Sequence, residues 1–94
     1  MRTLIFDESF RRALRKRGKK RPELRVKVTK VLSLLEVDPF NPSLKTHKLQ
    51  GELEGLWSCS VEYDCRIIFR FEALEEEEED AIVLIDIGNH DEVY

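Results

Sequence analysis

The chain has 94 residues, and we expect residues 1–94 to form a single domain with a modest hydrophobic core rather than two domains. Hydrophobic residues make up 41% of it, and no apolar run approaches the roughly 20 residues that cross a membrane. The N-terminus reaches charged residues after only a few apolar ones, so we expect no signal peptide and a cytoplasmic protein. Cys59 and Cys65 lack the spacing of metal ligands and are expected to be reduced thiols.

The net charge of −3 conceals a large difference between the two halves of the chain. Residues 1–50 hold 14 Lys and Arg against 5 Asp and Glu, whereas residues 51–94 hold 2 against 14. The densest basic stretch is residues 11–27, with ten basic residues and one acidic residue. Such a run is often only the solvated face of helices, but its density also makes a nucleic-acid backbone a candidate partner. The residues expected to contact RNA phosphates are Arg11, Arg12, Arg15, Lys19, Lys20, Arg21, Lys45 and Lys48.

The first half of the chain predicts a short strand followed by two helices. Residues 2–6 are expected to form the strand, and Asp7 then caps a helix that ends at Gly18. A second helix starts at Pro22, because the first turn does not need the N–H group that proline lacks. It stops at Asp38, the residue before another proline. Both helices carry apolar residues at helical spacing, so they should form an antiparallel hairpin that covers an apolar surface.

The second half predicts strands, because apolar and polar residues alternate along residues 57–62 and 65–72. Residues 81–88 are apolar at nearly every position, as in a central strand, and the acidic stretch before them is expected to be a solvated hairpin loop. The inner face should carry Trp57, Cys59, Val61, Cys65, Ile67, Phe69 and Phe71. The open face should carry Ser58, Ser60, Glu62, Arg66, Ile68, Arg70 and Glu72. The predicted fold is α+β, in the order β-α-α-β-β-β, with a mainly antiparallel sheet.

Two histidines and one strand arginine are the strongest candidates for chemistry. His47 approaches the first strand of the second half and His90 follows the last, so both could lie at one rim of the sheet. A histidine titrates near about 6.5 and can serve as base or acid at neutral pH. With Arg66 on the phosphate, these groups could support attack of an RNA 2′-OH on its adjacent phosphate without a metal. Zinc binding would need a third ligand that no spaced cluster offers. Isolated histidines are more often structural, and Ser58 and Arg70 are interpreted as ordinary solvent-facing residues.

A resemblance to a known family covers nearly the whole chain. The segments NPSLKTHKLQGELEGLWSCSVEYDCRIIFRFE and IVLIDIGNHDEVY resemble the RelE/ParE superfamily of toxins from bacterial toxin–antitoxin pairs. Within them, HKLQG, VEYD and GNHDEVY are most similar to the YafQ branch of RelE-type mRNA interferases. The resemblance implies a RelE-like α+β domain that cleaves mRNA in the ribosomal A site by the 2′-OH route, without a metal or other cofactor. It also implies a cognate antitoxin that holds the toxin inactive.

The same motifs imply roles for individual residues. His47 falls at a catalytic histidine of YafQ-like toxins, Asp64 at their catalytic aspartate and His90 at their second essential histidine. Tyr94 takes the place of their terminal aromatic residue, which would stack on or orient a nucleotide base. Arg66 resembles the strand arginine that RelE itself uses on the phosphate.

Two features depart from the family pattern. Ser60 stands where YafQ-like toxins have another histidine, and Arg66 could compensate for the missing proton-handling group. The chain is also acidic overall, whereas the family's toxins are usually basic. Two other functions stay open: inhibition of DNA gyrase in the manner of ParE toxins, and non-catalytic binding of an antitoxin or RNA. The retained catalytic set favours the nuclease, because a pure inhibitor would not need it.

Overall fold

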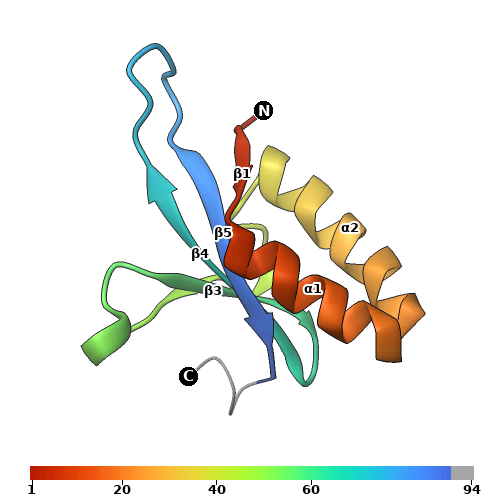
Figure 1. Cartoon of the computed structure of the whole chain (residues 1–94). Helices are drawn as coiled ribbons and strands as arrows, with labels where there is room; N and C mark the ends of the chain where they lie inside the picture. The colour runs from red at the N-terminus through yellow and green to blue at the C-terminus, as the bar shows by residue number, and fades with distance from the viewer. Residues whose placement is uncertain (90–94) are drawn as a thin grey trace.

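The computed structural model describes residues 1–89, and its elements follow the predicted order with one additional short strand (Figure 1). The helices are α1 (Glu8–Lys20) and α2 (Pro22–Val37). The strands are β1 (Leu4–Phe6), β2 (His47–Lys48), β3 (Trp57–Glu62), β4 (Cys65–Glu72) and β5 (Ala81–Gly88). Two single turns of 3-10 helix, η1 (Pro42–Leu44) and η2 (Gly51–Leu53), lie on either side of β2, the strand that periodicity did not predict. This arrangement confirms the α+β fold class.

The five strands form one sheet in the order β1-β5-β4-β3-β2. β1 runs parallel to β5, and the other three pairs are antiparallel, as expected for a mainly antiparallel sheet. The two helices lie side by side on one face of this sheet (Figure 1). β5 has a neighbour on each side and most of its apolar residues are buried, which explains why nearly every position in it is apolar.

Helix α1 begins where it was predicted but continues beyond the predicted end. The Asp7 carboxylate accepts a hydrogen bond from the backbone N–H of Ser9 at 3.1 Å, and this bond lowers the pKa of Asp7. Gly18 was expected to end the helix, but α1 runs to Lys20 and Gly18 is buried within it. A Cβ at Gly18 would lie 2.5 Å from Nε of Arg25, so the glycine makes room for a side chain of α2. The prediction was wrong because a glycine can mark a close approach as well as a helix end.

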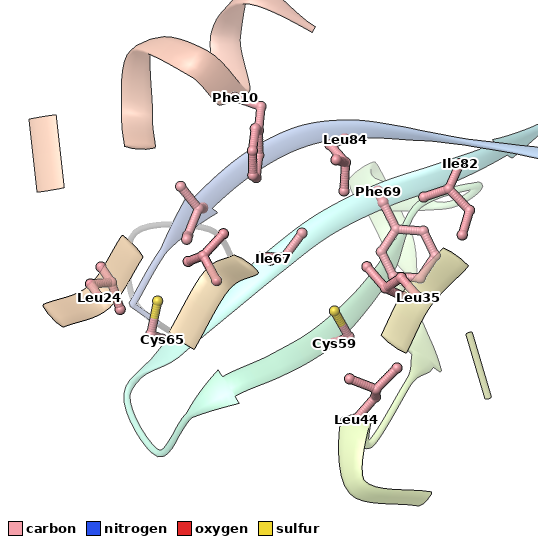
Figure 2. Packing of buried hydrophobic residues seen from close by; sticks show 12 residues of the cluster. Phe10, Leu24, Leu35, Leu44, Cys59, Cys65, Ile67, Phe69, Ile82 and Leu84 are labelled. Atoms are coloured by element: carbon pink, nitrogen blue, oxygen red, sulfur yellow. The ribbon is translucent and has the colours of Figure 1, made fainter. Parts of the chain in front are cut away.

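The main core fills the space between the helices and the sheet (Figure 2). Helix α2 starts at Pro22 and is capped by Asp38, as predicted. The buried members of this core are Phe10, Leu24, Val28, Leu35, Leu44, Cys59, Cys65, Ile67, Phe69, Ile82, Leu84 and Ile87. Burial raises the pKa of Cys59 to about 12 and that of Cys65 to about 11, so both free thiols stay protonated at neutral pH.

The sheet face turned away from the helices is covered in part. Leu49 and Ile68 are buried there, with Leu53 and Leu56 packed against them. The segment between β2 and β3 forms this cover, and it is closed by a 2.9 Å hydrogen bond from the N–H of Leu49 to the carbonyl of Leu56. Ser58 was expected to face solvent, but it is fully buried between β2 and β4. That expectation was wrong because it took no account of β2.

A β-bulge turns the end of β3 toward the helices. The pairing of β3 with β4 shifts between Ser60 and Glu62. Strict alternation predicted Glu62 on the open face, but the bulge places it where it forms ion pairs with Arg21 and Lys27. Hydrogen bonds from Arg21 and then Lys27 lower the pKa of Glu62, and the Lys27 Nζ lies 2.7 Å from its carboxylate. Glu62 therefore ties the end of β3 to the helical hairpin.

The β4–β5 hairpin extends beyond the rest of the molecule (Figure 1). Residues 75–80 at its tip are all exposed, which agrees with the predicted solvated acidic loop. Within residues 1–89, neither helix has the length and apolar character needed to span a bilayer.

Candidate functional site

His47 lies on the edge strand β2, and its side chain is exposed. It stands directly opposite Ser58 of β3. Opposed residues of an antiparallel pair share a face, and Ser58 alternates with the core residue Cys59, so His47 lies on the face away from the helices. Its Nδ1 is 3.1 Å from the backbone oxygen of Lys45, which has a left-handed conformation with φ of 51°. Because a carbonyl oxygen only accepts, this contact is a hydrogen bond in the tautomer that carries a proton on Nδ1.

Arg66 lies on the same face, opposite Ser60 of β3 and Gly88 of β5. Its Nε is buried and has no hydrogen-bond partner among residues 1–89. A buried N–H without a partner costs about 1–3 kcal/mol, so this group would gain from a bound anion that accepts the bond. Arg70, four residues further along β4, donates instead to the Glu72 carboxylate at 2.8 Å, which agrees with its interpretation as an ordinary surface residue.

The strand register gives a rough separation of His47 and Arg66. Strand β3 separates them laterally, and they are offset by two residues along it. With strands about 4.8 Å apart and a rise of about 3.3 Å per residue, their Cα atoms are roughly 12 Å apart, a distance that both side chains together can bridge. His90 and Tyr94, the other two candidates named from the sequence, lie outside the described residues.

Asp64 lies in a different environment, in the turn between β3 and β4. It lines a pocket of about 190 Å³ at the tip of the helical hairpin, together with Arg17, Lys20, Arg21, Leu24, Cys65 and Asn89. The structure thus brings Asp64 to the basic residues of the hairpin, and His47 is not among the residues that line this pocket.

Arg17 is a member of this pocket that the sequence analysis did not single out. Its Nε donates to the backbone oxygen of Ile87 at 3.2 Å, which joins α1 to the end of β5. Arg17 precedes Lys20 by three residues and Arg21 by four, the spacing of side chains on one helix face. That spacing was the signal that could have identified Arg17, Lys20 and Arg21 as one basic cluster.

The basic residues predicted to contact RNA fall in three places. Lys19, Lys20 and Arg21 lie at the tip of the helical hairpin, and Arg11, Arg12 and Arg15 lie nearer the start of α1. Lys45 and Lys48 lie on either side of His47, and the Lys48 Nζ is 5.5 Å from the centre of the Trp57 ring. Within the part of the chain that the structure describes, no group of three or more His, Cys, Asp and Glu side chains is placed to hold a metal ion.

Comparison with known proteins decides the family. Residues 2–94 match the family described as bacterial toxin of type II toxin–antitoxin system, YafQ. The chain belongs to the YafQ toxin family. A further relative is the YoeB toxin of Mycobacterium bovis, which is 34% identical over 44 residues that make up 47% of this chain and 52% of that protein. The chain therefore spans about half the length of this curated relative.

Solved structures share the fold of this chain. YafQ from E. coli strain BL21(DE3) superposes with a TM-score of 0.76 at 21% identity, covering 100% of this chain and 99% of that one. The E. coli DinJ–YafQ toxin–antitoxin complex superposes with a TM-score of 0.73 at 21% identity, covering 99% of this chain and 97% of that one. The YoeB/ParE toxin from Agrobacterium tumefaciens superposes with a TM-score of 0.76 at 18% identity, covering 94% of this chain and 98% of that one. At these identities the likeness concerns the fold, and it confirms the RelE-like architecture.

Proposed function

We propose that this YafQ family member is the toxin of a type II toxin–antitoxin system and cleaves mRNA on the ribosome, in the cytoplasm. The observation that carries this proposal is the sheet face shared by His47 and Arg66. An imidazole that can take a proton, beside a guanidinium whose buried Nε lacks a partner among residues 1–89, is complementary to a ribose hydroxyl and its phosphate.

In the proposed reaction, the 2′-hydroxyl gives its proton to one imidazole while its oxygen attacks the adjacent phosphorus. The bond from phosphorus to the 5′ oxygen breaks, and that oxygen takes a proton from the second imidazole, leaving a cyclic phosphate and a 5′-hydroxyl. His47 and His90 supply the two imidazoles, and Arg66 holds the non-bridging oxygens as their charge develops. Asp64 and Tyr94 complete the proposed set, Tyr94 by orienting a base. The scheme requires no metal and no other cofactor.

The tip of the helical hairpin is the proposed contact with ribosomal RNA. Lys19, Lys20 and Arg21 lie there together, at the end of the helix whose last turn is basic. Contacts with phosphates release counterions, so ribosome binding should weaken steeply as salt rises. Binding that is insensitive to salt would count against this contact.

An antitoxin is the proposed protein partner. The DinJ–YafQ complex joins a toxin of this fold to its antitoxin, which supports a corresponding partner for this chain. The charge of the chain supports the same partner, because the basic first half suits an acidic, partly disordered protein that folds on binding.

The decisive experiment is the substitution His47→Ala, assayed for ribosome-dependent mRNA cleavage. Loss of a general acid or base should lower the cleavage rate by about 100-fold or more. The thermal stability should not change, because the His47 side chain is exposed.

The matched control is Gln50→Ala, another exposed position in the same segment, which should cleave like the parent. Full cleavage by the His47 variant would refute its catalytic role. Gyrase inhibition by the parent protein without any cleavage would replace the nuclease with a ParE-type function, and the absence of both would indicate a non-catalytic binding protein.

A further inference from the structure

The turn between β3 and β4 carries an exposed tyrosine beside the tip of the helical hairpin (Figure 1). Tyr63 is 96% exposed, the largest value among the exposed large hydrophobic side chains of residues 1–89. It directly precedes Asp64, which lines the pocket of about 190 Å³ at the hairpin tip. The ring is therefore a neighbour of the pocket and is open to a ligand.

This pocket combines cations with one carboxylate. Lys20 is exposed and forms no ion pair within residues 1–89, whereas Arg21 is held in an ion pair with Glu62. The Lys20 ammonium is therefore available to an anion. Asp64 would repel a simple anion, but its carboxylate accepts hydrogen bonds from hydroxyl and amino groups. The pocket therefore suits a ligand that carries a phosphate together with such donors, as a nucleotide does.

The pocket lies close to the arginine that is proposed to hold the scissile phosphate. Cys65 lines the pocket, and Arg66 follows it in β4 with its side chain on the opposite face of the sheet. Asp64 and Arg66 are two residues apart, a rise of about 7 Å along an extended strand. An RNA strand held at Arg66 therefore reaches the pocket by crossing the turn that carries Tyr63.

We propose that Tyr63 and the pocket at the hairpin tip form a subsite for one nucleotide of single-stranded RNA, close to the scissile phosphate. The base stacks on the Tyr63 ring, Lys20 holds a phosphate, and Asp64 accepts a hydrogen bond from the sugar or the base. The inference rests on the proposed function, which supplies RNA as the ligand. A protein segment can also meet a tyrosine and a lysine, but the position of the pocket beside Arg66 favours the polynucleotide. Because every base has a face that can stack, the subsite adds affinity without a sequence preference.

The test measures, by fluorescence anisotropy, how a labelled adenosine hexanucleotide binds the His47→Ala protein, which is expected not to cleave it. A second hexamer has the same backbone and charge but lacks all bases. Tyr63→Ala should weaken binding of the adenosine hexamer by about fivefold or more, because stacking of one base is lost, and should leave binding of the abasic hexamer unchanged. Tyr63→Phe keeps the ring and should bind both hexamers as before. Thermal stability should be the same in all variants, because the Tyr63 side chain is exposed.

A lysine substitution tests the phosphate contact with the same two hexamers. Lys20→Gln should weaken binding of both alike, and should lower the slope of log affinity against log salt by about 0.7, the value for one contact with a single strand. Lys30→Gln is the control of equal charge, because Lys30 is an exposed residue of α2 outside the pocket. It should change the binding of neither hexamer.

The proposal is overturned if Tyr63→Ala binds the adenosine hexamer as tightly as before, or if it weakens both hexamers equally. It is also overturned if a glutamate hexapeptide binds more tightly than the RNA and loses that binding in Tyr63→Ala, because the partner would then be a protein. Ribosome-dependent cleavage by the parent protein is measured separately. Cleavage without any dependence of RNA binding on Tyr63 would remove only the subsite, and Tyr63-dependent binding without cleavage would remove only the nuclease.

Discussion

The two faces of the sheet use the same strands for different purposes. Among residues 1–89, twelve buried residues form the core between one face and the helices, whereas the buried cluster on the opposite face consists of Leu49 and Ile68. The opposite face also carries His47 and Arg66. Along β4, the core residue Ile67 directly follows Arg66, because successive side chains of a strand point to opposite faces. Neighbouring residues of one strand can therefore have different roles, one in the core and the next on the face that carries the candidate catalytic residues. Substitutions on the first face should mainly lower stability, and those on the second should mainly lower activity.

The largest effect is expected from emptying the helix-covered core. Phe69 is fully buried there, so Phe69→Ala should lower the free energy of unfolding by about 3–5 kcal/mol. Leu49→Ala on the opposite face should cost less, about 2 kcal/mol, because fewer groups pack around it. Urea denaturation measures both. If Phe69→Ala does not fold, Phe69→Leu and Leu49→Val give a milder comparison. Equal losses of unfolding free energy on the two faces would contradict the view that the helix-covered face contributes most of the stability.

A second substitution tests whether the opposite face serves chemistry rather than stability. Arg66→Gln should slow mRNA cleavage by about 100-fold, because it removes the charge proposed to hold the phosphate. Its free energy of unfolding should be unchanged or slightly raised, since the buried Nε has no partner among residues 1–89. Arg70→Gln, on the same strand and face, is the control and should cleave normally. Similar losses of activity in both variants would indicate a general effect of surface charge.

The smallest effect concerns Glu62, the strand residue that the bulge turns to the helical side. Its pKa is lowered from 4.5 in the folded protein, so its ion pairs stabilise the fold above that value and lose their effect as the pH falls through the lowered pKa. Glu62→Gln should therefore cost about 1 kcal/mol at pH 7, and the difference from the parent should disappear in acid. Thermal unfolding measured across pH checks this, with the exposed residue Glu52→Gln as control. A difference that stays constant down to low pH would rule out the ion pairs as its cause.

Most secondary-structure elements could be predicted because their signals are local. The Asp7 cap, the start of α2 at Pro22 and the alternation along residues 65–72 all depend on neighbours a few residues away. The two-residue strand β2 is too short to show a period, and it was missed. Its absence from the prediction also led to the wrong environment for Ser58.

The candidate site was predicted in its residues but not in its arrangement. Motifs and residue chemistry identified His47, Arg66 and Asp64, and the structure places the first two on one sheet face and the third beside the hairpin tip. Arg17 was missed because its position against the end of β5 depends on how α1 packs on the sheet. The pocket lined by Phe6 of β1, Arg11 of α1 and Arg25 of α2 likewise combines side chains of three elements that no local pattern connects.

The sequence by itself determined most of the elements of this protein, its α+β class, its family and the residues available for chemistry. These follow from periodicity, capping and motifs, which are properties of short segments of chain. Only the tertiary structure decided that Ser58 is buried, that Glu62 turns toward the helices and that Gly18 lies inside a helix. The reason is that strand pairing, bulges and close approaches arise from contacts between distant segments, and the spacing of residues along the chain is insensitive to them.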